Sequence, residues 1–184
     1  MNVLDFVVKI DDALPTEICD GLIKLFEESH HKDRLERGGY PNWTNLWICE
    51  HYPEVEQKLR NVYLAVARSY QEWLGEYGLY FNTRDFEFEG SNMKKYVGGT
   101  DDVYKRHVDV SSSATCERFL AMLFYLNDDF EGGETIFYPE MSIRPKKGSV
   151  VVFPPFWLFP HEGTPVIRGE KYIMSNYCLW NYDG

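Results

Sequence analysis

A histidine and an aspartate two residues apart, in the stretch "YKRHVDVSS" of residues 104–112, are the first candidates for chemistry in this sequence. β-Branched valines lie between and after them, which is typical of a strand. Side chains at positions i and i+2 of a strand point to the same face. We therefore expect His107 and Asp109 to project together into the interior, where an imidazole and a carboxylate could bind a divalent metal ion.

Such a metal needs at least one more ligand. In the 2-His-1-carboxylate arrangement, three side chains hold Fe(II) and leave positions open for other ligands. His161, in "FPHEGTPV", lies on a predicted strand late in the chain and is the best candidate for the second histidine. A strand histidine is also often a buried structural residue, and His-x-Asp pairs arise by chance, so spacing alone leaves both interpretations open. The remaining histidines lie beside predicted helices and are explained as helix-end cations or surface residues: His30, His31 and His51.

Lys171 follows His161 after a strand, the turn "VIRGE" and the start of a return strand. A cation buried in the interior is costly unless it is paired, and a dicarboxylate ligand would supply the partner. The alternative is a surface lysine in a charged turn beside Glu170. Position alone does not separate the two.

Composition limits the partners that these residues could serve. The chain has 184 residues, 16% aromatic residues and a formal net charge of −10. That acidity argues against nucleic acid or an anionic membrane and favours a small molecule or a peptide. No apolar run is long enough for a membrane span, and "MNVLDFVVKIDD" has acids where a secretory signal would be basic. We expect a soluble, cytoplasmic protein of unknown oligomeric state, with free cysteines because no C-x-x-C pair is present.

The first third of the chain is predicted to be mainly helical. Apolar spacing predicts helices over about 16–30, with Thr16 as N-cap, and over about 53–76. The charged, Gly-Gly-containing segment 32–47 suits a loop. After residue 80, short β-rich runs bounded by turn residues predict strands near residues 86–89, 93–97, 104–110, 119–126, 134–138, 149–153, 161–166 and 171–179.

These elements predict one domain spanning residues 1–184 and a mainly β fold with flanking helices. Residues 1–80 would form mostly helical support packed outside, and residues 81–184 a jelly-roll core. In "DDFEGGETIF" we expect a hairpin in which Gly132 and Gly133 supply positive φ, and in "PKKGS" a turn into the next strand. Gly163 could allow close backbone approach beside the metal.

Residues 96–180 resemble the catalytic core of the prolyl 4-hydroxylase-like branch of the 2-oxoglutarate- and Fe(II)-dependent dioxygenases. The matching stretches are "YVGGTDDVYKRHVD", "LFYLNDDFEGGETIFYP", "IRPKKGSVVVFP" and "HEGTPVIRGEKYIMSNYCLW", all in family order. "LPTEICDGLIKLFE" is similar to the helix that opens these domains. The resemblance covers nearly the whole chain, more weakly between residues 30 and 85, and it implies a double-stranded β-helix, cupin-like core.

Carried over residue by residue, the resemblance implies that the iron ligands are His107, Asp109 and His161. Lys171 matches the basic residue that binds the far carboxylate of 2-oxoglutarate. Two tyrosines match positions that reach this cosubstrate in some relatives, Tyr96 and Tyr125, although either could simply pack in the core. Other relatives use a threonine four residues before the second tyrosine, where this chain has Ala121. Tyr177, where relatives often have tryptophan, would line the pocket.

The resemblance implies a hydroxylase that uses Fe(II), 2-oxoglutarate and O2, and it leaves ascorbate open as an auxiliary reductant. Related halogenases lack the carboxylate ligand, so Asp109 favours hydroxylation of a C–H bond. The first substrate hypothesis is a prolyl residue of a peptide or protein. The alternatives are another amino-acid side chain, a small molecule, or a non-catalytic metal-binding interaction module. Segment 32–47 could act as a lid that contacts an extended chain through Arg34, Arg37, Tyr40, Trp43 and Trp47, or be an ordinary connection.

Overall fold

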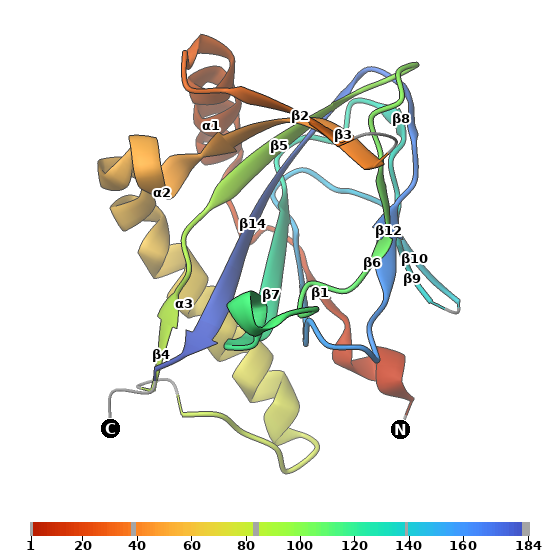
Figure 1. Ribbon diagram of the computed structural model, residues 1–184. Coiled ribbons are helices and arrows are strands. Elements are labelled where there is room, and N and C mark those ends of the chain that lie inside the picture. Colours follow the sequence, from red (N-terminus) through yellow and green to blue (C-terminus); the bar gives the residue numbers. More distant parts are fainter. Residues whose placement is uncertain (1, 38–39, 83–84, 139, 182–184) are drawn as a thin grey trace.

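The computed structural model describes residues 2–37, 40–82, 85–138 and 140–181. An antiparallel eight-stranded sheet forms its centre, in the order β1-β11-β7-β14-β5-β3-β2, with β4 also pairing with β14 (Figure 1). Its strands are β1 (Val8–Ile10), β2 (Asp33–Arg37), β3 (Tyr40–Trp47), β4 (Phe86–Phe88), β5 (Asn92–Val97), β7 (Arg118–Tyr125), β11 (Val150–Phe153) and β14 (Glu170–Trp180).

A smaller sheet faces one side of the large sheet, and a two-stranded ribbon extends the structure beside it (Figure 1). The small sheet has the order β10-β9-β12-β6, and the ribbon pairs β13 with β8. These strands are β6 (Tyr104–His107), β8 (Glu131–Gly132), β9 (Thr135–Phe137), β10 (Met141–Ile143), β12 (His161–Gly163) and β13 (Val166–Arg168). The predicted mainly β, jelly-roll fold is confirmed.

Helices cover the other side of the large sheet (Figure 1). They are α1 (Thr16–Glu28), α2 (Ile48–His51) and α3 (Pro53–Gly75), accompanied by short 3-10 helices η1 (Val3–Phe6) and η2 (Ser113–Thr115). Pro53 at the first position of α3 suits a helix start, because proline lacks the N–H that would be unsatisfied there. Predicted helices 16–30 and 53–76 are confirmed within two residues, but Pro15, not Thr16, is the N-cap of α1.

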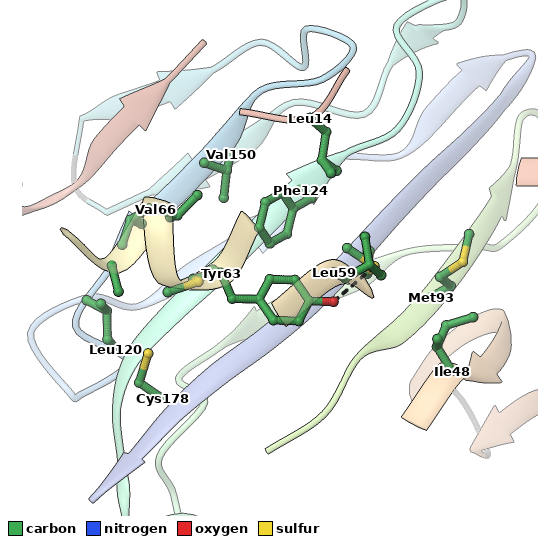
Figure 2. Close-up of a cluster of buried hydrophobic side chains, with 14 of the residues drawn as sticks. Leu14, Ile48, Leu59, Tyr63, Val66, Met93, Leu120, Phe124, Val150 and Cys178 are labelled. Atoms are coloured by element: carbon green, nitrogen blue, oxygen red, sulfur yellow. Dashed lines mark hydrogen bonds between the residues drawn. The ribbon is translucent and has the colours of Figure 1, made fainter. Parts of the chain in front are cut away.

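The outer core lies between the helices and the large sheet. On α3, buried residues recur at helical spacing, so one stripe of the helix faces the sheet. Figure 2 shows Tyr63 of this stripe packed beside Phe124 of β7, with Leu59 and Val66 from neighbouring turns. Burial of each such side chain stabilises the fold by about 1.5–3 kcal/mol. This core fixes the large sheet from behind and leaves its inner face for other groups.

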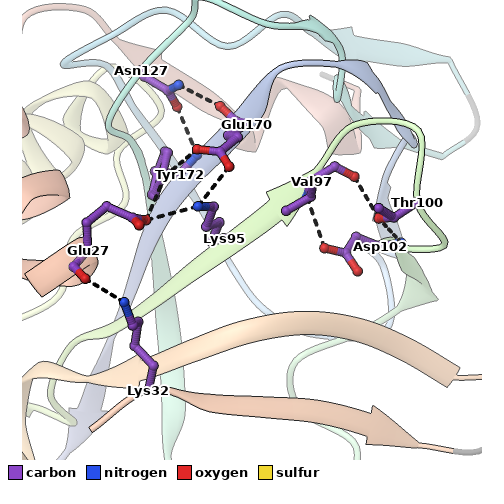
Figure 3. A network of polar contacts seen from close by, with 9 residues as sticks. All are labelled: Glu27, Lys32, Lys95, Val97, Thr100, Asp102, Asn127, Glu170 and Tyr172. Carbon is purple, nitrogen blue, oxygen red and sulfur yellow. Dashed lines mark hydrogen bonds and ion pairs between the residues drawn. The ribbon is translucent and has the colours of Figure 1, made fainter. Parts of the chain in front are cut away.

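A polar network ties α1 to the edge of the two central strands (Figure 3). Lys95 of β5 lies 3.0 Å from a carboxylate oxygen of Glu27 on α1 and 2.8 Å from one of Glu170 on β14. The Tyr172 hydroxyl oxygen lies 2.7 and 2.8 Å from the same two carboxylates and can donate its one proton to either. Burial opposes the charge of Lys95, but hydrogen bonds to the two glutamates outweigh it and raise its pKa. The outward-facing lysine of β5 is therefore fully paired.

The prediction of a loop over 32–47 is wrong. Residues 33–37 and 40–47 form β2 and β3, and β3 pairs with β5 from Thr44 opposite Lys95 to Trp47 opposite Asn92. The exposed edge of β5 offers unpaired backbone groups, and pairing with it imposes strand structure on a sequence of weak local preference. The side chains of Arg37 and Tyr40 lie outside the described residues.

Other expectations had mixed outcomes. All eight predicted strands are present, whereas the short strands β1, β8, β10 and β13 were not predicted. Gly132 and Gly133 have the expected positive φ, but β8 and β9 do not form a hairpin, since each pairs with a different later strand. Gly148 forms the predicted turn into β11.

The four cysteines are free, and in the described parts of the chain no helix is long and apolar enough to span a membrane.

Candidate metal centre

The space between the two sheets contains the three predicted ligands. His107 ends β6 and pairs directly with His161 at the start of β12, so the small sheet places both imidazoles side by side. The Nε2 atom of His107 lies 3.4 Å from one carboxylate oxygen of Asp109, and the Nε2 atom of His161 lies 3.7 Å from the other. One ligand atom from each residue falls within 4.8 Å of the others. The structure thus brings the three residues together.

Asp109 does not lie on the strand that spacing predicted. Strand β6 ends at His107, and Asp109 follows in a bend. Its carboxylate is held by the Tyr177 hydroxyl, which donates to Oδ1 at 3.1 Å, and Arg118 donates to its backbone carbonyl at 3.3 Å. The two side chains converge because of these contacts from the large sheet and not because of strand alternation.

Backbone carbonyls orient both imidazoles. The Nδ1 atom of His107 lies 2.8 Å from the carbonyl of Lys105, and that of His161 lies 3.1 Å from the carbonyl of Phe159. A proton on each Nδ1 satisfies these carbonyls and leaves the Nε2 lone pairs directed at Asp109. The buried Nε2 of His107 has no hydrogen-bond partner in the described part of the chain. Two neutral imidazoles and a carboxylate with converging lone pairs fit a divalent transition metal such as Fe(II).

Electrostatics favour the ligand-competent protonation states. Burial opposes ionisation of Asp109, but attraction to His161, the contact with His107 and the cation of Lys94 outweigh it and hold the pKa of this carboxyl far below its usual range. Burial lowers the pKa of His161, the direction that favours a metal-binding imidazole, although the Asp109 carboxylate opposes this shift. Phe153 and Phe137 pack around His161, with ring centroids 4.9 and 5.2 Å away, and limit the access of water on that side.

A pocket with an empty volume of about 600 Å³, counted to its open mouth, adjoins these three residues. It is lined by both sheets. From the large sheet, side chains of β5, β7 and β14 line it, among them the predicted cosubstrate residues Tyr96 and Lys171. The third predicted residue, Tyr125, lies behind the lining and donates a hydrogen bond to Thr135 of the small sheet, which does line the pocket.

Lys171 is a buried cation in this pocket. Only 4% of the residue is exposed, and its Nζ atom donates to the carbonyl of Gly133 at 2.6 Å. Among the described residues no carboxylate lies within ion-pair distance of it. Burial lowers the pKa of Lys171 to about 8, and Glu134 opposes this only from a distance. An anionic ligand would supply the missing partner.

The two predicted tyrosines flank Lys171. Their rings lie 5.8 Å (Tyr96) and 5.6 Å (Tyr125) from its Nζ atom. The Tyr96 hydroxyl is buried without a hydrogen-bond partner among the described residues, so it can donate to a ligand. The Tyr125 hydroxyl already donates to Thr135 at 2.7 Å. A Cβ atom at Gly163 would lie 4.0 Å from the Lys171 Nζ atom, which is an ordinary contact distance.

Residues 91–179, from β5 to β14, match the sequence model of the 2OG-Fe(II) oxygenase superfamily. This segment contains all three candidate iron ligands and Lys171. The part of the chain that carries the candidate site is therefore similar to the 2OG-Fe(II) oxygenase superfamily.

One curated relative extends the similarity beyond this segment. A protein of Acanthamoeba polyphaga mimivirus, named "Putative prolyl 4-hydroxylase", is 28% identical over 159 residues, covering 76% of this chain and 57% of that protein. The chain therefore spans little more than half of its length.

Two solved structures share the fold of this chain. The viral collagen prolyl hydroxylase of Paramecium bursaria Chlorella virus-1, in complex with 2OG, has a TM-score of 0.70 at 24% identity, covering 97% of this chain and 99% of that one. A prolyl hydroxylase from Trichoplax adhaerens, bound to a peptide of hypoxia inducible factor, has a TM-score of 0.74 at 17% identity, covering 96% and 85%. At these identities the likeness establishes the fold alone.

Sequence reasoning missed two charged residues that line the pocket, Lys94 and Glu162. Only 8% of Lys94 is exposed. The available signal was alternation on β5, since Lys94 shares a strand face with Tyr96 whereas Lys95 faces the helices. The rings of Trp43 and Tyr104 lie near it, and Tyr104 stacks on His107 at 3.7 Å between ring centroids.

Proposed function

We propose that the protein is an Fe(II)- and 2-oxoglutarate-dependent dioxygenase that hydroxylates a C–H bond of a prolyl residue in a peptide or protein. The observation that carries this proposal is the pairing of two unlike sites in one pocket. Three converging ligand atoms lie at His107, Asp109 and His161, and an unpaired buried cation lies at Lys171. A metal and a diacid are the ligands that such a pocket can hold together. The prolyl hydroxylase names of the mimivirus and viral relatives support the choice of substrate.

Each residue has a task that follows from its contacts. The two Nε2 lone pairs and the Asp109 carboxylate would hold the iron. Lys171 would pair with the far carboxylate of 2-oxoglutarate, and the unpaired Tyr96 hydroxyl would donate a hydrogen bond to the same molecule. Tyr125 would support this end through Thr135. Two-point binding fixes the orientation of the cosubstrate before any chemistry.

When bound, the iron supplies oxidative chemistry: dioxygen and 2-oxoglutarate are converted so that one oxygen atom enters the C–H bond, with succinate and carbon dioxide as the other products. The chain's own contribution is positioning and exclusion of water. Phe137 and Phe153 close one side of the centre, and Tyr177 keeps the carboxylate of Asp109 in place.

The metal and cosubstrate assignment is tested anaerobically. Addition of Fe(II) and 2-oxoglutarate to the full chain should produce a visible charge-transfer absorption. Asp109→Ala and His161→Ala should lose this absorption, whereas His51→Ala, which removes an imidazole outside the pocket, should keep it. Absence of the absorption in the wild type, or its persistence in the two ligand variants, would show that the site assignment is wrong.

The substrate is tested with a panel of peptides and free amino acids, in which mass spectrometry follows a product 16 Da heavier while succinate release is measured in parallel. A prolyl peptide should give both signals in equal amounts. If a side chain other than proline is modified, the proposed dioxygenase activity stands and the proposed substrate is wrong. If no member of the panel gives either signal, the result favours a non-catalytic metal-binding module.

A further inference from the structure

Lys94 is a second buried cation in the pocket, and the proposed chemistry does not use it. It lies on the inner face of β5, and its Nζ atom donates to the hydroxyl of Ser175 on β14 at 2.9 Å. Both residues line the pocket. Its neighbour on the strand, Lys95, points to the opposite face and lies between two glutamates.

The charge of Lys94 lacks a partner of its own. In the described parts of the chain no carboxylate lies within 4.0 Å of its Nζ atom, and its hydrogen-bond partner is a neutral hydroxyl. Burial lowers the pKa of Lys94 to about 8, and attraction to Asp109 from beyond contact distance only partly offsets this. A buried ammonium in this state is stabilised by any anion that reaches it.

Lys94 and Lys171 mark different parts of the pocket. Lys171 and Ser175 are four residues apart on β14 and share a face, which separates them by roughly 13 Å along the strand. Lys171 lies between Tyr96, Tyr125 and Gly133, whereas Lys94 reaches toward Ser175 beneath the rings of Trp43 and Tyr104. One diacid held by Lys171 and the metal centre leaves Lys94 for the other organic molecule in the reaction.

We propose that Lys94 and Ser175 form a carboxylate-binding subsite for the substrate, so that the preferred substrate carries a carboxylate close to the carbon that is hydroxylated. This inference rests on the proposed function and deepens it. The carboxylate could come from an aspartate or glutamate side chain beside the acceptor residue, or from the C-terminus of a short peptide. Lys94 donates to it while Ser175 and the two aromatic rings limit its position.

Paired peptides test this directly. Each contains a single proline and carries either glutamate or glutamine at one neighbouring position, and each is made with a free or an amidated C-terminus. Binding to the full chain, loaded anaerobically with Fe(II) and 2-oxoglutarate, is measured by calorimetry so that no turnover is needed. We expect one acidic form to bind tighter than its neutral counterpart by roughly tenfold to a hundredfold, as hydrogen bonds to charged groups contribute. The position of the effective acid distinguishes a side chain from a C-terminus.

Variants then assign the preference to Lys94. Lys94→Met should reduce the ratio of acidic to neutral affinity to near one, and Ser175→Ala should reduce it less. Lys95→Met removes the same charge from the same strand on the opposite face and should leave the ratio unchanged. If Lys94 only supported Asp109, its removal would weaken the binding of all peptides equally and leave the ratio of acidic to neutral affinity unchanged.

The inference is overturned if no acidic peptide binds more tightly than its neutral counterpart in the wild type, or if Lys94→Met keeps the wild-type ratio. The wild-type comparison stands even if a variant fails to fold. Failure of the proposed function has a different signature, because the charge-transfer absorption and succinate release are measured independently of the charge on the peptide.

Discussion

Replacing Lys171 by methionine should make the ligand-free protein more stable and, at the same time, make 2-oxoglutarate a poor ligand. Methionine keeps much of the length and volume of the lysine stem, so the cavity between Tyr96 and Tyr125 stays filled. What disappears is a charge buried at 4% exposure without a carboxylate partner in the described part of the chain. The two effects have opposite signs, which makes the prediction specific.

The stability gain can be sized from the pKa. A fall from the ordinary 10.5 to about 8 corresponds to a penalty of about 3 kcal/mol at neutral pH, since each pKa unit is about 1.4 kcal/mol. Loss of the hydrogen bond to the Gly133 carbonyl returns about 1 kcal/mol of this. The free energy of unfolding should therefore rise by about 2 kcal/mol, or the melting temperature by about 4–8 °C for a chain of this size.

The pH dependence provides an internal check. Between about pH 8 and 10.5 the unfolded chain keeps the Lys171 proton that the folded chain has released, so the stability of the wild type rises with pH across this window. The variant has no such proton at this position. The stability that Lys171→Met gains over the wild type, measured by urea unfolding, should be largest at or below pH 8 and shrink as the pH approaches 10.5.

Ligand binding should move the other way. The lost charge-assisted contact is worth about 1.5–3 kcal/mol, so the dissociation constant for 2-oxoglutarate should rise roughly 10- to 150-fold while Fe(II) affinity changes little. Lys95→Met is the matched control: it breaks ion pairs to Glu27 and Glu170, so it should lower stability and leave 2-oxoglutarate affinity unchanged. A Lys171→Met protein that is less stable than the wild type yet binds 2-oxoglutarate normally would refute the assignment of this lysine.

Two further outcomes follow from local geometry. Gly148→Ala should destabilise the fold by several kcal/mol in urea unfolding, because φ is +79° and the new Cβ would lie 2.4 Å from the Leu14 carbonyl oxygen, whereas Gly75→Ala, with open space around it, should be neutral or slightly stabilising. In the native protein a thiol reagent should modify exposed Cys116 quickly and Cys178 only after unfolding, because Cys178 is buried and burial raises its thiol pKa; equal rates for the two would contradict the packing.

The strands could be predicted from the sequence where side-chain pattern and turns agreed. Residues 119–126 are apolar on both alternating faces, and β7 is indeed covered by helices on one side and by the small sheet on the other. The hairpin of β2 and β3 could not be predicted, because charges, a Gly-Gly pair and a proline dominate its local preference. Its structure comes from pairing with β5, a partner some fifty residues away in the chain.

The site shows the same division. His107 and Asp109 were chosen because strand alternation would align them, yet Asp109 lies in a bend and is aligned by Tyr177 and Arg118 from the large sheet. The two side chains do lie together as predicted, but strand alternation is not the reason. Lys94 was missed, although strand alternation turns it to the same inner face as Tyr96, because Tyr96 was chosen from the family resemblance and alternation was not applied to its neighbours.

Several polar groups without partners in the described residues lie in the pocket between the sheets. Two of the four buried side-chain atoms without a hydrogen bond, the Tyr96 hydroxyl and the His107 Nε2, belong to residues that line it, as do the two incompletely paired lysines. The other two atoms belong to Gln71 on α3 and Asn92 on β5. Each such group lowers the stability of the ligand-free fold. The outer core of α1, α3 and the large sheet must offset this, because it carries most of the buried apolar side chains. A fold that keeps these groups unpaired is poised to gain stability from ligands, so iron, diacid and substrate should each raise the melting temperature in turn.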